Sequence, residues 1–313
     1  MSNQLMVGID CGASKVMVQS GFYNPTKKTI CPSDLHFEYS YSDHHLWNTN
    51  FIPKNLDIQH QELTEKSINL TPEEQVQGNV IIETIQKAIS APGLTLAGLC
   101  FPGIKNNKGV VIMANGPRIP NMVERLNNIV IYNDSECCVL GERWSTIGHL
   151  NKTENAFYIG GGTGIADGLI MNSRIINLSG DSSIKRSWEL KFYDESVESY
   201  LSPAGILKHH NTQFKSSIST LSELAISKDG MHTFNKALDA FSYLLNDRIK
   251  IFDTNNLKIE KIIIGQRLGE FLKKDINHLG QLFKERTKIP IKYSSDRRTA
   301  SLGAIWKKYA SKR

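Results

Sequence analysis

Two stretches with the same pattern of apolar and polar positions stand out in the sequence. Residues 6–20 and residues 158–171 each contain an apolar run, a turn with glycine, and a second run in which apolar positions alternate. Such alternation predicts a returning β-strand, whereas a dinucleotide-binding fingerprint has a helix directly after its glycines. One hairpin opens each half of the chain, and together they form a weak internal repeat. The pattern favours a duplicated nucleotide-binding α/β architecture with a cleft between the halves over two unrelated hairpins.

The turns of both hairpins have the composition of phosphate-binding loops. The second turn is the denser of the two, with glycines at Gly160, Gly161, Gly162 and Gly164. Glycine permits positive φ and leaves no side chain in the way, so that backbone N–H groups can approach a phosphate closely. We therefore predict that both turns bind phosphate.

The rest of the chain alternates between strand and helix patterns. The clearest helix start has Thr71 as the expected N-cap, Pro72 at the first position and Glu74 completing a capping box. Residues 21–61 are rich in turn residues and aromatics, which predicts further strands and a long excursion. Two prolines within residues 115–120 predict a loop. Further strands are predicted at residues 96–100, 110–113, 129–132, 262–265 and 289–293, and helices at residues 72–90, 136–146, 219–226, 233–252, 267–284 and 299–309.

Length and composition narrow the class of protein. The chain has 313 residues, enough for two domains, and its 40% hydrophobic and 22% charged residues are typical of a soluble globular protein. A formal net charge of +6 without a basic stripe of interleaved aromatics argues against nucleic acid as a partner. No apolar run reaches the length of a membrane span, and the N-terminus lacks a secretory signal. The five cysteines lack C-x-x-C spacing and are expected to be reduced, which predicts a cytoplasmic protein.

Several short motifs follow one another in a recognisable order. They are residues 8–15, Pro102-Gly103, Asn133-Asp134, and residues 140–142, 162–165, 198–202, 263–265 and 302–304. This order resembles the ROK family of sugar kinases, within the actin/hexokinase/Hsp70 superfamily, over nearly the whole chain. The resemblance implies a two-lobed actin-like (ribonuclease H-like) α/β fold, with two mixed sheets, helices on both faces and a central cleft. The expected N-terminal lobe is residues 1–122 with a closing helix at 299–313, and the C-terminal lobe is residues 123–298.

The resemblance also implies ATP-dependent phosphorylation of a hydroxyl on a hexose or hexose derivative. Asp134 would be the general base, and Asp10 would hold Mg²⁺, through water, on the β- and γ-phosphates. The ATP-binding residues would be Gly12, Gly162, Thr163, Gly164 and Gly265, and the sugar-binding residues Asn133, Arg118, Glu189 and Glu198. From the residues alone, Asn133-Asp134-Ser135 is also typical of a helix N-cap, in which Ser135 caps while Asp134 faces the cleft, and Asp10 is also typical of a turn. A homodimer is expected as well.

Departures from the family pattern bear on substrate and metal. Residues 187–192 (SWELKF) stand where many members have Gly-Glu-x-Gly-His, so Glu189 keeps the glutamate and the histidine is missing. The cysteines of the family's zinc cluster are absent, so no zinc is expected. Arg118 occupies the place of a sugar-binding asparagine. Either its guanidinium binds a carboxylate or phosphate on the substrate, or it points to solvent and the loop has changed shape. Gln266-Arg267 replaces a glycine-rich turn, which leaves nucleotide selectivity open.

Other classes of function compete with the kinase. A catalytically inactive sugar- or nucleotide-binding sensor would explain the missing zinc cluster and histidine, but the retention of Asp10 and Asp134 favours the kinase. The family's repressors carry an N-terminal helix-turn-helix, and this chain begins at its first strand, so DNA binding is disfavoured. An ATPase activator with an iron–sulfur cluster would need bridging cysteines at a spacing that this sequence lacks.

Overall fold

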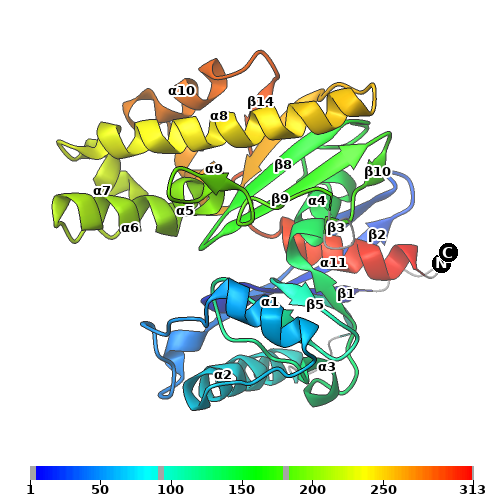
Figure 1. Cartoon of the computed structure of the whole chain (residues 1–313). Coiled ribbons are helices and arrows are strands. Elements are labelled where there is room, and N and C mark those ends of the chain that lie inside the picture. Colours follow the sequence, from blue (N-terminus) through cyan, green and yellow to red (C-terminus); the bar gives the residue numbers. More distant parts are fainter. Residues whose placement is uncertain (1–4, 91–94, 179–182, 312–313) are drawn as a thin grey trace. The chain divides into compact units, whose positions relative to one another are not determined.

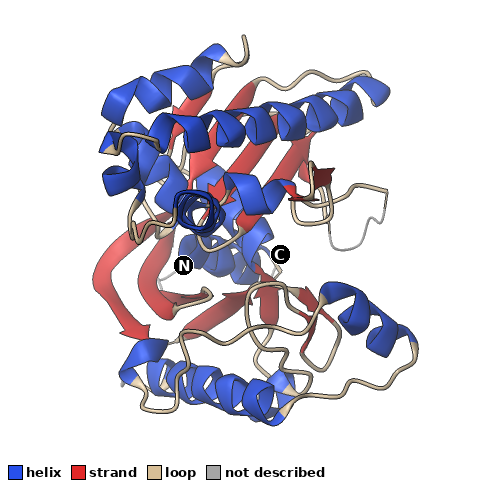
Figure 2. Cartoon of the chain, turned by 60° about the vertical axis from the view of Figure 1, so that its left-hand side comes forward, coloured by secondary structure: helices blue, strands red, loops and turns tan. Residues whose placement is uncertain are grey.

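The chain forms two compact units of mixed α/β structure (Figure 1). The computed structural model describes residues 5–90, 95–178 and 183–311. Unit 1 comprises residues 1–147 and 298–313, and unit 2 comprises residues 148–297. Figure 2 distinguishes the strands and the helices of both units. Within the described ranges, no helix combines the length and the apolar character needed to cross a membrane.

Residues 123–147 belong to unit 1, so the boundary between the units lies later than the predicted one at residue 122. Strand β7 (Ile131–Asn133) pairs with the sheet of unit 1. Helix α4 (Asp134–Trp144) follows it directly and packs along the closing helix α11 (Thr299–Ala310). Because β7 pairs with the first sheet and α4 packs on α11, both elements belong to unit 1.

Glycines allow α4 and α11 to approach closely. A Cβ atom on Gly141 would lie 1.8 Å from the carbonyl oxygen of Thr299, and one on Gly303 would lie 1.9 Å from that of Cys137. Any larger residue at either position would force the helices apart. This packing gives a physical reason for two of the short motifs in the sequence.

The sheet of unit 1 has the strand order β3-β2-β1-β4-β7. Its further strands are β1 (Met6–Cys11), β2 (Lys15–Asn24), β3 (Thr29–Ser40) and β4 (Leu96–Phe101). β1, β2 and β3 are antiparallel neighbours, which confirms the predicted N-terminal hairpin, and β4 and β7 run parallel to β1. The carboxyl ends of β1, β4 and β7 therefore lie at the same edge of the sheet.

Different helices bury the two faces of this sheet. On one face, Ile9 belongs to the core that the sheet forms with helix α2 (Pro72–Ile89). On the other, α11 lies so close that a Cβ atom on Gly8 would be 1.9 Å from the carbonyl oxygen of Ser301. Because successive side chains of a strand point to opposite faces, Asp10 shares the face of Gly8.

Helix α2 begins where predicted, but half of the predicted capping box is replaced. The Thr71 hydroxyl accepts a hydrogen bond from the N–H of Glu74 at 3.0 Å. The Glu74 carboxylate accepts instead from Arg118, a residue in the loop after strand β6 (Val110–Ile112). A tertiary contact has therefore taken the place of a local one.

Helix α1 (Leu56–Thr64) lies in the region predicted as strands and excursion. Its two buried side chains, Gln59 and Glu62, are polar, so the pattern of apolar positions carries no helical signal there. Gln59 fixes the helix by donating to the carbonyl of Met113 at 3.0 Å and accepting from its N–H at 2.8 Å. A hairpin of β5 (Ile104–Lys105) and β6 (Val110–Ile112) and the short helix α3 (Met122–Arg125) complete unit 1.

The sheet of unit 2 repeats the topology of unit 1. Its order is β10-β9-β8-β13-β14, with β8 (Ala156–Gly161), β9 (Ile165–Met171), β10 (Arg174–Ile175), β13 (Lys261–Gly265) and β14 (Ile291–Tyr293). β8, β9 and β10 are antiparallel neighbours, and β13 and β14 run parallel to β8. The same order with the same directions in both sheets confirms the predicted duplicated α/β architecture.

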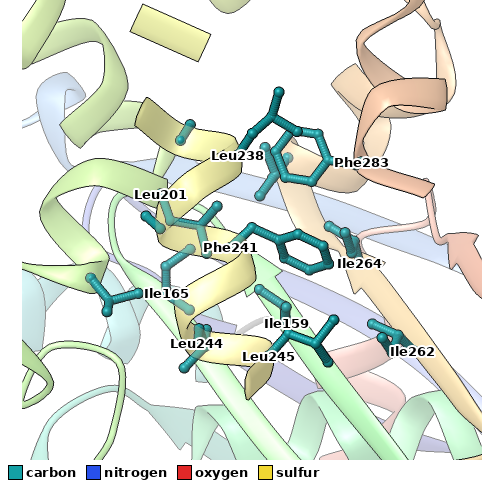
Figure 3. Packing of buried hydrophobic residues seen from close by; sticks show 14 of the residues in the cluster. Ile159, Ile165, Leu201, Leu238, Phe241, Leu244, Leu245, Ile262, Ile264 and Phe283 are labelled. Carbon is teal, nitrogen blue, oxygen red and sulfur yellow. The ribbon is translucent and has the colours of Figure 1, made fainter. Parts of the chain in front are cut away.

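Helices form most of the core of unit 2. They are α5 (Val197–Leu201), α6 (Pro203–Phe214), α7 (Leu221–Ile226), α8 (Gly230–Thr254), α9 (Gln266–Lys273) and α10 (Leu279–Glu285), and a small hairpin joins β11 (Lys191–Phe192) to β12 (Glu195–Ser196). The long helix α8 was predicted from its spacing of apolar residues. Figure 3 shows Phe241 and Leu245 of α8 beside Ile159 and Ile262 of the sheet.

The single helix predicted over residues 267–284 is wrong, because the chain breaks it in two. α9 ends at Lys273, and α10 begins six residues later. Between them, Asp275, Asn277 and His278 have φ near +50° to +60°, in the left-handed region. An α-helix cannot pass through residues in that conformation.

Candidate functional site

The edge of the unit 1 sheet brings together the two acids that the sequence singles out. Asp10 of β1 is the register partner of Cys100 in β4, and Phe101 of β4 is the partner of Asn133 in β7. Asp134 follows as the first residue of α4. Neighbouring strands lie about 4.8 Å apart, so Asp10 and the end of β7 are about two strand spacings apart, with β4 between them. In open α/β sheets, ligands bind at the carboxyl ends of the strands.

The charge on Asp10 decides what this edge can bind. Burial and the nearby carboxylate of Asp134 raise the pKa of Asp10 to about 7, against the opposing bond from Cys100 and charge of Lys15. The Cys100 thiol donates to Oδ1 of Asp10 at 3.4 Å. Mg²⁺ commonly uses one or two carboxylates and keeps several waters, so Asp10 with bound water fits the predicted magnesium site. No cluster of three or more potential side-chain ligands occurs in the described ranges, so water and substrate would supply the other ligands.

Tyr41 holds the β1–β2 turn in place. The N–H of Gly12 donates to the carbonyl of Lys15 at 2.9 Å, and the Tyr41 hydroxyl donates to the carbonyl of Gly12 at 3.2 Å. The N–H of Tyr41 also donates to the carbonyl of Ser14 at 3.0 Å, and its side chain is fully buried. Gly12 lies outside the left-handed region, so the turn does not use the positive φ that we expect of glycine. What Gly12 provides is a backbone without a side chain over it.

Asn133 is the N-cap of α4, so the predicted cap at Ser135 is wrong. Oδ1 of Asn133 accepts from the N–H of Glu136 at 3.2 Å and from the Ser135 hydroxyl at 2.6 Å. This arrangement places Asp134 in the first turn of α4, where the helix dipole favours a carboxylate. The cap thus fixes the residue beside it, and the predicted sugar contact of Asn133 stays a prediction.

The β8–β9 turn of unit 2 leaves one glycine open. The N–H of Gly162 donates to the carbonyl of Gly164 at 2.8 Å, and no atom of the described chain lies within 4 Å of the Cβ position of Gly162. At Gly161, by contrast, a Cβ atom would lie 2.5 Å from Cβ of Leu268. As in the first turn, neither Gly161 nor Gly162 has a positive φ. Packing explains Gly161, whereas the space around Gly162 and its neighbour Thr163 suits the approach of a ligand.

Glu198 supports the β8–β9 turn through a hydrogen bond to its backbone. Its Oε2 accepts from the N–H of Ile165, the first residue after the turn, at 2.7 Å, and its own N–H donates to the carbonyl of Ser187 at 3.2 Å. One carboxylate oxygen of Glu198 is therefore committed to the conformation of the turn. The predicted contact between Glu198 and a sugar stays a prediction.

Glu189 forms a two-bond ion pair with Arg186. Arg186 Nε donates to Oε2 at 2.7 Å, and Nη2 donates to Oε1 at 2.6 Å. The guanidinium of Arg186 also lies 4.5 Å from the centre of the Trp188 ring. Both oxygens of Glu189 thus accept from the Arg186 guanidinium. This pairing orients the carboxylate, and the positive charge of Arg186 balances its negative charge.

Gly265 ends β13 next to Gly160 of β8, its register partner. A Cβ atom on either glycine would lie 2.8 Å from the Tyr158 hydroxyl oxygen, so the Tyr158 side chain requires both glycines. Gln266 follows with φ of 60°, in the left-handed region, and starts α9. The strand-to-helix turn predicted beside the nucleotide is therefore strained, and strain of this kind is common at functional sites.

Arg118 is enclosed by residues of unit 1. Its side chain is fully buried, so the alternative in which it points to solvent is wrong. The guanidinium donates to Glu74 from Nε at 2.8 Å and from Nη2 at 3.0 Å, to Glu62 from Nη1 at 2.5 Å, and to the carbonyl of Asn69 at 3.1 Å. Burial raises the pKa of Glu62, but the bonds from Lys54 and Arg118 lower it to about 2. These acids already occupy the guanidinium, which argues against the alternative in which it binds a carboxylate or phosphate of the substrate.

Three residues that shape the two turns and the acidic edge carry no recognisable signal in the sequence. Tyr41 holds the first turn, and Lys105 donates to carbonyl oxygens at the end of β4. Arg248 is fully buried in unit 2 and donates to Asp167 at 2.6 Å and to the carbonyl of Lys185 at 2.7 Å. Tyr41 and Arg248 act on residues distant in sequence, so local patterns cannot reveal their contacts. Lys105 bonds to residues two to four positions away, but no pattern of apolar and polar positions marks such bonds.

Comparisons with solved structures give the fold an independent basis. A ROK family glucokinase from Streptomyces griseus, solved with glucose and AMPPNP, is 15% identical with a TM-score of 0.61, covering 96% of this chain and 98% of the other. A ROK family protein from Streptococcus pneumoniae in complex with sucrose is also 15% identical, with a TM-score of 0.61 and 99% coverage of both chains. A ROK family transcriptional regulator, homologous to the E. coli MLC protein, is 13% identical with a TM-score of 0.58, covering 98% of this chain and 78% of the other.

These likenesses establish the actin-like α/β fold of the ROK sugar kinases for this chain. No family model matches the sequence. No curated protein matches it either. The fold therefore includes both kinases and a regulator among its solved examples, and function has to be argued from the residues.

Proposed function

We propose that this protein transfers the γ-phosphoryl group of ATP to a hydroxyl of a hexose or hexose derivative. The observation that supports the proposal best is the pair of acids at the carboxyl ends of parallel strands, Asp10 and Asp134, whose mutual repulsion calls for a cation. The open backbone at Gly162 and the fold shared with a glucokinase that binds glucose and AMPPNP add support.

In the proposed reaction, Asp134 is the general base. Its carboxylate accepts the proton of the sugar hydroxyl as that oxygen bonds to the γ-phosphorus, and the bond from the γ-phosphorus to the bridging oxygen breaks to release ADP. A base in this role contributes roughly 10²–10⁴-fold to the rate. Its place in the first turn of α4 and the cap at Asn133 keep it oriented.

Asp10 and the glycine turns are assigned to Mg–ATP. Bound Mg²⁺ would neutralise charge on the β- and γ-phosphates, and Asp10 would orient it through water. Gly12 in unit 1 and Gly162, Thr163 and Gly164 in unit 2 would bind phosphates through their backbones. Gly265 would lie beside the adenosine.

Glu189, Glu198 and Asn133 are the candidates for the sugar. We leave Arg118 out of this set, because its guanidinium is satisfied by Glu62 and Glu74. The remaining candidates, Glu189, Glu198 and Asn133, supply no cation for an acidic substrate, so we propose a neutral or N-acylated hexose.

The test is ADP release from Mg–ATP across a panel of neutral, N-acylated and acidic sugars. Asp134→Asn should reduce sugar-dependent turnover by roughly 10²–10⁴-fold. Asp34→Asn, at an exposed position of β3, is the matched control and should behave as the wild type. The absence of turnover with every sugar would overturn the proposal.

The second candidate function is a sugar- or nucleotide-binding sensor without catalysis. The fold shared with a transcriptional regulator is the observation that favours it. Titration calorimetry distinguishes the two: clear binding of a sugar or of ATP by a protein with no turnover would support the sensor.

A further inference from the structure

The ammonium group of Lys105 is fixed at the end of β4. Its Nζ donates to the carbonyl oxygens of Phe101 at 2.6 Å, Gly103 at 2.8 Å and Pro102 at 3.4 Å. Gly103 has φ of +84° and turns the chain so that Lys105 folds back over the strand it has just left. Three carbonyl acceptors match the three N–H donors of an ammonium group. The backbone therefore holds the charge in one place.

The register of the sheet puts the end of β4, where that charge is held, between the strands that lead to the two acids. β4 is the central one of three parallel strands, with Asp10 opposite Cys100 on one side and Asn133 opposite Phe101 on the other. Since Nζ lies against the carbonyl of Phe101, it is about one strand spacing from the position where Asp134 follows Asn133. The closeness of Lys105 to Asp134 therefore depends on the register of β4 and β7, because the two residues are far apart in sequence.

The charges around Lys105 are mixed. Burial lowers its pKa, the carboxylate of Asp134 and the thiols of Cys100 and Cys137 oppose that effect, and the ammonium of Lys307 adds to it. Lys307 is itself paired with Glu136 on α4, so part of its charge is balanced there. Asp134 is the largest stabilising influence on Lys105, and the attraction between two charges is mutual.

We propose that Lys105 is a positioning residue for the base: its fixed ammonium orients the Asp134 carboxylate and offsets the repulsion between Asp134 and Asp10. This inference rests on the proposed kinase function. The phosphates of ATP add negative charge at the moment of transfer, when two acids already lie close together. A cation held by carbonyl oxygens, which carry no net charge, keeps its full charge for Asp134, whereas one paired with a further carboxylate would not.

Three substitutions separate the charge of Lys105 from its hydrogen bonds. Lys105→Met removes both, Lys105→Gln keeps donors for the carbonyl oxygens without the charge, and Lys105→Arg keeps the charge. Lys108→Met, on an exposed residue of the same hairpin, is the control. If the methionine variant does not fold, the comparison of glutamine with arginine still decides the question.

We expect Lys105→Gln to lower kcat about 10- to 100-fold, with KM for sugar and for ATP changed less than about threefold, because a misplaced base affects the transition state. Lys105→Arg should recover most of the lost kcat, and Lys108→Met should match the wild type. If Lys105 had only a structural role, its substitution would instead lower the melting temperature in proportion to the lost activity. Lys105→Arg would then recover no more kcat than Lys105→Gln.

The outcomes separate the two proposals. If the wild type turns over sugar and Lys105→Gln keeps its kcat, the positioning role is overturned and the kinase stands. A glutamine variant whose KM rises while kcat is unchanged also overturns it. A wild type without any sugar-dependent turnover overturns the kinase and, with it, the role of Lys105.

Discussion

The two sheets of this protein share one topology and differ in what they carry at the same edge. In unit 1, the register pair at the ends of the first and fourth strands is Asp10 and Cys100. In unit 2, the pair at the equivalent ends of β8 and β13 is Gly160 and Gly265. One edge thus carries a carboxylate with a raised pKa, and the other carries bare backbone.

Under the proposed kinase function, the two edges would have different roles toward Mg–ATP. A carboxylate cannot approach phosphate without a cation between them, whereas a backbone N–H group can. We therefore assign the charged edge to the proposed metal and base, and the glycine edge to the proposed phosphate contacts. The topology is common to both, and the side chains decide the chemistry.

The units also differ in the segments that their buried ion pairs stabilise. Each contains a fully buried arginine, Arg118 paired with Glu62 and Glu74, and Arg248 paired with Asp167 and Asp247. The first holds the region between α1 and α2, and the second holds the chain near β9. The arginines stabilise different units, which makes the comparison testable.

The largest expected effect on stability concerns these arginines. Removing one partner of a buried ion pair costs roughly 3–5 kcal/mol, because the buried acid on the other side, Glu74 for Arg118 and Asp167 for Arg248, loses its cation. Arg118→Met should therefore lower the free energy of unfolding of unit 1 by that amount and leave unit 2 protected, and Arg248→Met should do the reverse. Hydrogen exchange read separately in each unit is the measurement.

Arg286→Met is the control for the arginine pair, since its ion pair with Asp239 is exposed and is expected to contribute about 0–1 kcal/mol. If one arginine substitution lowered the free energy of unfolding equally in both units, each arginine would not stabilise its own unit alone. A loss of sugar affinity in Arg118→Met without loss of stability would return Arg118 to the substrate site.

The next effect concerns Asp10 and pH. Its pKa is about 7 in the folded chain and near 3.8 in the unfolded one, so the folded state binds the proton more tightly. The stabilising contribution of neutral Asp10 is present below about pH 4 and is lost as the pH rises to about 7. At about 1.4 kcal/mol per unit of pKa, the loss is at most about 4 kcal/mol, and partial exposure of the side chain reduces it.

In chelator, the melting temperature of the wild type should therefore fall between pH 5 and pH 8, and Asp10→Asn should remove most of that fall. Mg²⁺ at pH 8 should restore stability to the wild type and not to the variant. Asp34→Asn, at an exposed site, should keep the full pH dependence. Equal slopes for Asp10→Asn and wild type in calorimetry would show that Asp10 is ionised throughout, as a turn residue would be.

The smallest effects compare two glycines of unit 2. Gly265→Ala should cost about 1–3 kcal/mol, because the new methyl group meets the Tyr158 hydroxyl oxygen at 2.8 Å. Gly162→Ala should change stability by less than about 0.5 kcal/mol, because its Cβ position is open. We expect it instead to weaken binding of an ATP analogue about tenfold, by the loss of close backbone approach. Unchanged affinity in Gly162→Ala would remove this turn from the nucleotide site.

Much of the fold could be predicted from local patterns. The two hairpins, helix α2 with its cap at Thr71 and the long helix α8 all lie where alternation, capping residues and helical spacing predict them. The predictions that failed were also local. Helix α1 buries Gln59 and Glu62 rather than apolar residues, and the helix over residues 267–284 is interrupted by left-handed residues such as Asn277, which periodicity does not detect.

The sequence predicted part of the candidate site. Asp10, Asp134 and the glycines of the β8–β9 turn could be named because short motifs in a fixed order surround them. The partners of the other side chains could not. Arg118 reads as an unusual residue in a loop, and only the positions of Glu62 and Glu74, on two helices, show that it is enclosed.

The amino-acid pattern alone established a duplicated α/β chain with strand–turn–strand hairpins, because side-chain periodicity and turn chemistry act between residues a few positions apart. The folded chain alone established that Glu198 supports the β8–β9 turn and that Asn133 caps α4. It also established that Lys105 donates to the end of β4, the strand between those of Asp10 and Asn133. Which atoms meet in these contacts depends on strand register and helix packing, and both are set by the burial of the whole core rather than by any short segment.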